Sequence, residues 1–414
     1  AMAHQGYIEN HNGTASWNHD GKLTIWTSTQ GAFGIRQNVA RILNLPLGDL
    51  RVIPTEIGGG FGAKNVVYLE PLAALLSKKS GRPVQITMNR TEVLEATGPT
   101  SGTRTFIKMG AKRDGTLVAA DIRLEYQAGA YPGSPVPGGA RCALGSYDVP
   151  HQRIIGLDIV LNRPKVAAYR APGAPASAFA VEAVLDELAD MLEMDPMELR
   201  QKNGTSEGQP RSDGAVHGSV GVQEVITATM QHPHYRAEIT EPDVGRGVAM
   251  GFWQNGGGES SAYATVHADG TTTLVTGSVD IGGQRASLAM QFAETMGIAY
   301  EDVNSLVGDT DTIGYTGNTG GSRTTFATGW AAYQAALDIR EQLEQRVAAI
   351  WEVDAIDVNY DPQDASLHGP DGKTMTFKEA ARRLPATGGM IQGHADIVST
   401  NVGKVGECFG AHVA

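Results

Sequence analysis

Residues 20–60 read DGKLTIWTSTQGAFGIRQNVARILNLPLGDLRVIPTEIGGG, and residues 269–308 read DGTTTLVTGSVDIGGQRASLAMQFAETMGIAYEDVNSLVG. Each stretch opens on an Asp-Gly pair, which favours a tight hairpin turn. A β-like run, a polar loop, a helix-like run and a second β-like run then follow in the same order. From the opening aspartate to the closing glycine is 38 residues in the first stretch and 39 in the second. We therefore predict a duplicated strand–loop–helix–strand unit, with chance similarity of two such units as the alternative.

Other turn and helix signals predict the remaining elements. The Asp114-Gly115 pair separates two β-like runs and predicts another hairpin. Asp195 followed by Pro196 predicts a helix start, with Asp195 as the N-cap. Residues 330–351 predict a longer helix. Its inward face is expected to carry Tyr333, Leu337, Val347 and Ile350. Helices and hairpins in mixed order predict an α+β fold with mixed sheets.

The composition limits the domain organisation and the classes of partner. The chain has 414 residues, which suggests two to three domains, and a polar, interrupted stretch at 204–246 places a boundary near residue 240. We predict one domain over 1–240 and a second over 241–414. The net charge of −12 disfavours nucleic acid and anionic membranes as partners. Without a long apolar run or a signal-like start, a cytoplasmic location is expected.

The cysteine count excludes some cofactors from this chain. Cys142 and Cys408 are the only two cysteines, too few for a four-thiolate zinc site or an iron–sulfur cluster. We expect two buried free thiols rather than a disulfide.

Two glycine-rich loops are candidates for ligand binding. Residues 58–62 hold four glycines around Phe61, which allows close approach of a ligand to the backbone. The spacing fits neither the phosphate loop of nucleotide hydrolases nor the dinucleotide fingerprint. Residues 316–325 form a second loop, rich in glycine and hydroxyl groups, ahead of the long helix, and such a loop suits an anion. A tight turn with a core phenylalanine and a plain capping loop are the alternatives.

Single charged residues give weaker indications. Arg170 precedes Pro172 in extended backbone and can project into a cleft to bind a carboxylate or phosphate. Asp309 and Asp311 can ligate a cation, but capping of their own loop is the favoured interpretation.

Taken together, these motifs resemble one family. The matching segments are Thr29-Gln30, residues 58–64, Tyr169-Arg170 ahead of 182–189, 195–200, the Gly-Gly loop at 282, and 308–310 with 321–323. They are similar to the molybdenum hydroxylases, the family of xanthine dehydrogenase, aldehyde oxidase and carbon monoxide dehydrogenase. The resemblance is to the molybdopterin-binding large subunit and runs from about Ala3 to Ala414.

The resemblance implies a molybdenum–pterin cofactor, expected as its cytosine dinucleotide, with molybdenum held through the pterin and no protein metal ligand. Catalytic roles would fall on Gln30, Arg170 and Glu407, the last within a Val405-Gly406-Glu407 stretch similar to the family's Gly-Glu motif. Residues 409–414, however, resemble a strand that the family places before that motif. The implied cofactor contacts are Gln30, Gly60, Phe61, Gly62, Arg170, Gly282, Gly283, Gln284, Gly321, Ser322 and Thr324.

The implied activity is oxidation of an aldehyde, N-heterocycle or aromatic small molecule, with water as the oxygen source. Iron–sulfur and FAD groups are expected on other subunits of an oligomer, so the isolated chain, which resembles a fragment, is expected to be inactive. Ala171 stands where carbon monoxide dehydrogenase carries its copper-binding cysteine, and Asn65 where purine-oxidising members carry a glutamate. The competing hypotheses are a non-catalytic fragment that binds cofactor or partner subunits, and a metal-free protein whose glycine loops hold a nucleotide.

Overall fold

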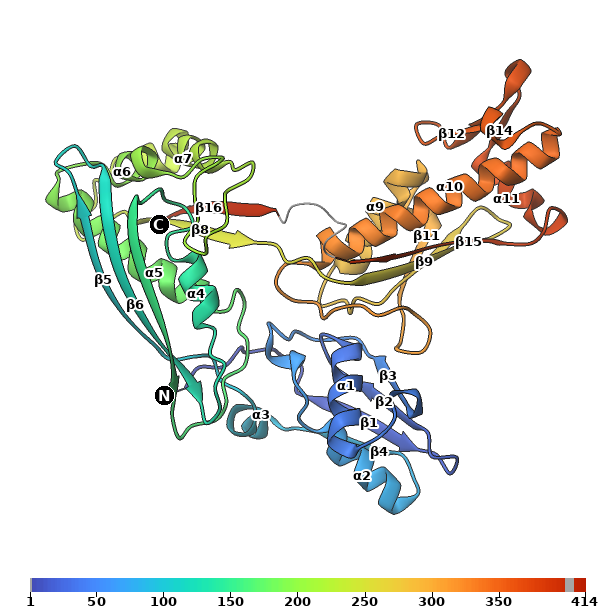
Figure 1. Ribbon diagram of the computed structural model, residues 1–414, viewed down its shortest axis with the longest axis horizontal. Helices are drawn as coiled ribbons and strands as arrows, with labels where there is room; N and C mark the ends of the chain where they lie inside the picture. The colour runs from blue at the N-terminus through green and yellow to red at the C-terminus, as the bar shows by residue number, and fades with distance from the viewer. Residues whose placement is uncertain (1, 399–405) are drawn as a thin grey trace. The chain divides into compact units, whose positions relative to one another are not determined.

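The computed structural model describes residues 2–398 and 406–414 (Figure 1). The chain packs into two compact units, each discontinuous in sequence. The duplicated unit contains Gly6–Val93 together with 256–398, and the second unit contains Leu94–Asn255 with the described residues of both chain ends. The domain boundary expected near residue 240 would divide the chain into two continuous segments, whereas each compact unit combines separate segments. The expected boundary stays a prediction.

The duplicated unit holds two sheets of identical topology, with strand orders β3-β2-β1-β4 and β11-β10-β9-β15. In each sheet an antiparallel hairpin leads through a helix to a parallel strand at one edge. A second helix then leads to an antiparallel strand at the other edge. The predicted duplication is therefore confirmed. The first copy comprises β1 (Asn12–Trp17), β2 (Leu23–Thr27), α1 (Ala32–Leu43), β3 (Leu50–Pro54), α2 (Glu70–Ser80) and β4 (Val84–Thr87), and the second β9 (Ser260–Val266), β10 (Thr272–Thr276), α9 (Gln284–Met296), β11 (Val303–Val307), α10 (Gly329–Trp351) and β15 (Ile391–Ile397).

The Asp-Gly pairs form the two hairpin turns as predicted. Gly21 and Gly270 adopt positive φ angles of 88° and 86°, which a glycine accepts without steric cost. The preceding aspartates accept hydrogen bonds from the amides two residues on, Asp20 from Lys22 at 3.0 Å and Asp269 from Thr271 at 2.9 Å. The same local chemistry therefore starts both copies.

The long helix α10 packs on its sheet differently from the prediction. Its buried face is built largely from alanines, completed by Ile339, Leu343 and Val347, whereas Tyr333, Leu337 and Ile350 are only partly buried. Small side chains allow the helix backbone to approach β9 and β15 closely; together α9 and α10 cover one face of that sheet (Figure 1). Val347 is buried and Ile350 packs against the core as expected, so the expected inward set was wrong for Tyr333 and Leu337 only.

The duplicated unit also carries smaller elements, most of them inserted between α10 and β15 of the second copy. A three-stranded sheet of order β12-β13-β14 and the short helix α11 pack near the end of α10. Their bounds, with that of α3, are β12 (Asn359–Asp361), β13 (Ser366–His368), β14 (Thr374–Thr376), α11 (Phe377–Arg383) and α3 (Arg90–Ala96).

The second unit is built on a sheet of order β5-β6-β7, in which β6 is antiparallel to β5 and parallel to β7. The hairpin at Asp114-Gly115 is confirmed as the β5–β6 turn, and Asp195 caps α6 by accepting from the Met197 and Glu198 amides. A two-stranded ribbon joins β8 to β16. The elements are β5 (Thr103–Ala111), β6 (Leu117–Gly129), α4 (Val136–Cys142), β7 (His151–Val160), α5 (Ala174–Met191), α6 (Pro196–Asn203), α7 (Val222–Gln231), α8 (Pro233–Arg236), β8 (Val248–Gln254) and β16 (Glu407–Val413).

A buried ion pair holds α5, α6 and β8 together. The Arg200 guanidinium is fully buried and donates to the Glu182 carboxylate at 2.9 Å. Glu182 also accepts from the Tyr147 hydroxyl at 2.6 Å and from the Met250 amide at 2.8 Å. Both residues belong to the motifs that carry the family resemblance, and here they serve packing. Within the described ranges, we find no helix of the length and apolarity that a bilayer crossing needs.

Replacing Arg200 with Met should destabilise the second unit strongly, because the buried Glu182 carboxylate would lose its countercharge. We expect a loss of about 3 kcal/mol or more in the free energy of unfolding, measured by urea denaturation. Arg153→Met is the matched control, since its pair with Asp121 is largely exposed and should contribute under about 1 kcal/mol. Equal losses in the two variants would contradict the prediction.

Candidate functional site

Gln30 links the two copies of the duplicated unit through its side-chain amide. Its side chain is buried, with the residue 2% exposed. Its Oε1 accepts from the Gly62 amide at 2.8 Å, and its Nε2 donates to the Thr319 carbonyl at 2.8 Å. The Thr319 amide in turn donates to the Gln30 carbonyl at 2.8 Å. The loop at 58–62 and the loop at 316–325 therefore meet at one glutamine.

Glycine is required at two positions around this amide. A Cβ atom on Gly60 would lie 2.4 Å from Gln30 Oε1, and one on Gly31 would lie 2.7 Å from the Asn318 Cβ. Both distances are shorter than real Cβ contacts, so a larger residue at either position would displace its neighbour. Gly31 therefore allows the close approach of the two copies, and Gly60 allows the first glycine loop to pack against Gln30 within the first copy.

The buried Lys64 fixes the end of the first glycine loop through its side chain and its carbonyl. The lysine is 1% exposed, and its Nζ donates to Glu9 Oε2 at 2.7 Å and to Ser28 Oγ at 2.8 Å. Its carbonyl accepts from the Gln30 amide at 3.0 Å. Burial alone would raise the pKa of Glu9, but hydrogen bonds from Lys64, Ser28 and the Gly58 amide lower it to about 2. Sequence reasoning missed Glu9, since nothing near it in sequence marks it as a partner of residue 64.

Three of the nine described non-glycine residues with positive φ angles lie in loops that the sequence singled out. Phe61, Ser322 and Ala171 have positive φ angles of 52°, 56° and 55°, a region that costs a non-glycine residue about 1 kcal/mol or more. Phe61 is 39% exposed, although an aromatic ring gains most from burial. Strained residues of this kind concentrate at ligand sites, so the strain favours a binding role for these loops over a plain tight turn.

The loop before α9 presents open backbone. Gly282 and Gly283 have positive φ angles, and space lies free beside their Cα atoms. The Asp280 carboxylate accepts from the Gly282 amide at 2.8 Å and the Gln284 amide at 3.1 Å, which fixes the loop at the helix start. The Gln284 side chain turns back to accept from the Ile281 amide at 2.9 Å. The loop is therefore held rigidly while its glycines stay accessible.

The loop at 316–325 is organised around a buried arginine. Arg323 donates to the Gly257 carbonyl at 2.7 Å, the Gly317 carbonyl at 3.0 Å and Ser260 Oγ at 2.7 Å. Gly321 and Ser322 are exposed, whereas the Thr324 hydroxyl is buried and has no hydrogen-bond partner among the described residues. A π-helical turn, Thr324–Thr328, precedes α10, and such turns recur at functional sites. A buried hydroxyl without a partner is costly, so this atom is suited to a bound polar ligand.

A pocket of about 270 Å³ opens where the strand ends of the two copies face each other within the duplicated unit. It is crossed by Arg285, which pairs with Asp280 at 3.0 Å and with Glu56 at 2.9 Å. Its lining follows β3, β10 and β11 at their carboxyl ends, where α/β sheets commonly bind ligands. The lining residues are Pro54, Thr55, Glu56, Val279, Asp280, Arg285, Leu306 and Val307.

The remaining two predicted catalytic residues belong to the second unit. Arg170 is exposed ahead of α5, beside the strained Ala171. Glu407 opens β16, and its buried carboxylate forms ion pairs with Arg211 and, at 2.7 Å, with His217. Each oxygen of the Glu407 carboxylate contacts one of these side chains, and the general-base role of Glu407 stays a prediction. Val405 of the same motif lies outside the described residues.

The described residues contain one group of side chains that could hold a metal ion, Asp361, Asp364 and His368 on the β12–β13 hairpin. Asp364 and His368 are largely exposed and pair with each other at 3.4 Å. Asp309 is bound by Arg51, and its carboxylate accepts from the Asp311 amide at 2.9 Å. The capping interpretation of Asp309 is therefore confirmed.

Acid should destabilise the duplicated unit through Glu9. Because its folded pKa lies below the unfolded value of 4.5, the stabilisation is complete above that pH and is lost as the pH falls toward 2. Glu9→Gln should flatten the pH dependence of the unfolding midpoint over this window, measured by circular dichroism. The exposed Glu341→Gln on α10 should leave it unchanged. A Glu9→Gln profile as steep as that of the parent protein would contradict the assignment.

The sequence was compared with family models and with curated proteins, and both comparisons found similar proteins. Two family models, both described as molybdopterin cofactor-binding domain, match residues 1–204 and 228–414. The chain is 29% identical over 405 residues to the xanthine dehydrogenase molybdenum-binding subunit of Escherichia coli O157:H7, covering 92% of this chain and 54% of that protein. It is 30% identical over 356 residues to the aldehyde oxidoreductase of Megalodesulfovibrio gigas, covering 81% of this chain and 39% of that protein.

Solved structures share the fold. Quinoline 2-oxidoreductase from Pseudomonas putida 86 matches with a TM-score of 0.91 at 23% identity, over 100% of this chain and 57% of its own. Aldehyde oxidoreductase from Desulfovibrio gigas matches with a TM-score of 0.81 at 26% identity, over 100% of this chain and 46% of its own. The chain spans about half the length of the curated relatives it matches.

Proposed function

The chain belongs to the molybdenum hydroxylase family through its two molybdopterin cofactor-binding domains, and from this premise we propose that it binds molybdopterin for the oxidation of a small organic substrate. The single observation that carries the proposal is the Gln30 amide, which hydrogen-bonds to a glycine-rich loop of each copy. We propose the cytosine dinucleotide form of the cofactor, as expected from the sequence.

The residues present fit a polar, multiply anionic ligand. The open backbone at Gly282, Gly283 and Gly321 offers close approach, and the amides of Gly283 and Gly321 can serve as N–H donors, whereas that of Gly282 is bound by Asp280. The unpartnered Thr324 hydroxyl supplies a buried donor, and Ser322 an exposed one. Neither copy needs a protein thiolate for such a ligand. The proposed cradle consists of Gln30, Gly60, Phe61, Gly62, Gly282, Gly283, Gln284, Gly321, Ser322 and Thr324, all in the duplicated unit. The role of Arg170, in the second unit, stays a prediction from the sequence.

When bound, this cofactor supplies the redox centre and Lewis acid for hydroxylation with water as the oxygen source. The chain's own residues position it. Gln30 Nε2 makes one hydrogen bond within the described residues, to Thr319, so its second hydrogen can be donated to an oxygen of the bound group. The partly exposed Phe61 ring supplies an apolar wall that excludes water from the reacting face.

The substrate proposal is an aldehyde, an N-heterocycle or another aromatic compound. The family resemblance gives Arg170 the role of an active-site arginine, and its guanidinium is suited to bind a carbonyl or carboxylate group. Asn65 Oδ1 accepts from Asn318 Nδ2 at 2.8 Å, and Asn65 Nδ2 donates to the Gly62 carbonyl at 3.2 Å. Its side chain is therefore engaged in joining the loops, which disfavours a purine substrate that would need a glutamate there.

We propose that electrons leave through iron–sulfur and FAD groups on other subunits of a cytoplasmic oligomer. Both cysteines are free thiols as expected, but Cys408 is exposed, so the expectation that both would be buried was wrong for Cys408. Two separate thiols cannot assemble a cluster. Carbon monoxide is disfavoured as substrate because Ala171 stands beside Arg170 in place of a copper-binding thiol.

The direct test is metal and pterin analysis of the full-length subunit, expressed in a host that makes molybdopterin and in one that does not. We expect about one molybdenum and one pterin per chain from the first host and neither from the second. A nucleotide without molybdenum would favour the metal-free ligand-binding hypothesis. Cofactor without activity in the assembled enzyme would favour the non-catalytic one.

Gln30→Leu should lower cofactor retention sharply. The change removes both amide contacts and leaves the Gly62 amide and Thr319 carbonyl without partners, a penalty of about 1–3 kcal/mol for each group. Molybdenum per chain after gel filtration is the measurement, with Gln345→Leu on the exposed side of α10 as the control. Full molybdenum content in Gln30→Leu would show that the linked loops do not form the site.

The purified chain should show no steady-state turnover, because electrons left on the bound group would have no exit. We expect at most one oxidation event per chain with an aldehyde or N-heterocycle, followed by stopped-flow spectroscopy. Sustained hydroxylation by the 414-residue chain alone would overturn the need for partner subunits.

A further inference from the structure

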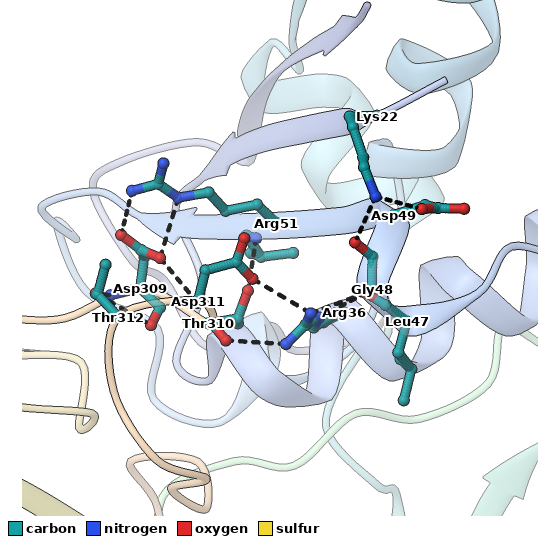
Figure 2. Close-up of polar contacts among 11 residues, drawn as sticks. Lys22, Arg36, Leu47, Gly48, Asp49, Arg51, Asp309, Thr310, Asp311 and Thr312 are labelled. Atoms are coloured by element: carbon teal, nitrogen blue, oxygen red, sulfur yellow. Dashed lines mark hydrogen bonds and ion pairs between the residues drawn. The ribbon is translucent and has the colours of Figure 1, made fainter. Parts of the chain in front are cut away.

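Residues 308–319 of the second copy contact the first copy at successive points along the segment. Figure 2 shows the contacts of Asp309, Thr310 and Asp311. We propose that this segment, which we call the strap, is a positioning element, with Asp309 and Arg51 as the residues that set the Gln30–Thr319 contact and hence the loop at 320–324. The inference rests on the proposed function, because it concerns how the same site keeps its cofactor.

The distal end of the strap is fixed by a two-pronged ion pair. Arg51 Nε donates to Asp309 Oδ1 at 3.0 Å, and Arg51 Nη2 to Asp309 Oδ2 at 2.6 Å. The aspartate side chain is only 11% exposed. Paired contacts of this kind fix both distance and orientation, which a lysine in place of Arg51 would not do.

The next contacts join the strap to the free edge of β3. Thr310 Oγ1 accepts from the Val52 amide at 2.9 Å, and the Thr310 amide donates to the Val52 carbonyl at 3.2 Å. Arg36 on α1 donates to the Thr310 carbonyl at 2.9 Å and pairs with Asp311 at 3.2 Å (Figure 2). An otherwise unpaired strand edge is thereby satisfied by the strap.

The proximal end reaches the site. The Tyr315 and Phe33 rings lie 5.2 Å apart, and Asn318 Nδ2 donates to Asn65 Oδ1 at 2.8 Å. Thr319 then bonds Gln30 in both directions and donates from its hydroxyl to the Val279 carbonyl at 2.6 Å. Only a few residues separate Thr319 from Ser322 and Thr324, so a shift at the distal anchor is transmitted directly into the candidate cradle.

The first copy has no equivalent strap among the residues that the structure describes. Its closing glycine, Gly58, is held instead by Glu9, whose carboxylate accepts from the Gly58 amide at 2.7 Å. The Arg51–Asp309 pair therefore acts on the second loop only, and a substitution there should affect 316–324 without loosening 58–62.

The test compares Asp309→Asn, Arg51→Lys and the exchanged pair Arg51→Asp/Asp309→Arg in the full-length subunit. The first readout is amide hydrogen exchange at 316–320 in cofactor-free protein, where we expect exchange on the order of tenfold faster in the single variants. The second is the rate of molybdenum loss from loaded protein, expected to rise by a similar factor. The exchanged pair should restore part of both.

Asp49→Asn is the matched control, because its pair with Lys22 at 2.6 Å is exposed and does not touch the strap (Figure 2). Unchanged exchange at 316–320 in the single variants would overturn the proposal. Faster exchange with unchanged molybdenum loss would also overturn it, by showing that the strap does not position the cradle. A chain that holds no molybdenum at all refutes the proposed function, while the exchange readout still decides whether the strap sets the loop.

Discussion

A buried primary amide must have partners for its donor and its acceptor, and Gln30 finds them on loops from two different copies of one fold. That requirement explains the glycines at 31 and 60, where any side chain would collide with the amide or with Asn318. It also explains why Lys64 is buried, since its carbonyl holds the Gln30 backbone while its ammonium group is neutralised by Glu9. The candidate site depends on this one side chain staying where both loops can reach it.

Duplication supplies the two loops, and asymmetry makes them different. Both copies follow the same strand order, so both place a glycine-rich loop after their parallel edge strand. The first loop is fixed by a segment ahead of β1, through Glu9, whereas the second is fixed by the edge of the first copy's own sheet, through Val52 and Arg51 (Figure 2). If the two loops were held in the same way, they would present the same groups to a ligand. Because they are held differently, the first loop presents the strained Phe61 ring, and the second presents hydroxyl groups and open backbone.

Short-range chemistry made much of this fold predictable. The Asp-Gly turns, the Asp195 cap and the two matching strand–helix–strand runs depend on neighbours in sequence, and each is found where the pattern predicts it. The face of α10 was not predictable in the same way, because large apolar residues were expected inward and the sheet instead required the small volume of alanine. Glu9 and Arg51 were missed for a related reason: their partners lie 55 and 258 residues away, and no local pattern encodes such pairs.

The charged residues inside the family motifs hold the loops in place, whereas other groups in the same motifs are left to contact a ligand. Lys64, Arg323, Arg200 and Asp309 all sit in stretches that carry the family resemblance, and each is buried against protein groups rather than directed at open space. A buried charge tolerates little change, because its partners must change with it. The charged residues of these motifs therefore belong to the packed framework that fixes the shape of the loops. The groups not engaged in that framework are backbone amides, the exposed Ser322, the buried Thr324 hydroxyl and the exposed Phe61 ring. This set offers hydrogen-bond donors and one apolar ring, which suit a polar ligand with a flat ring system.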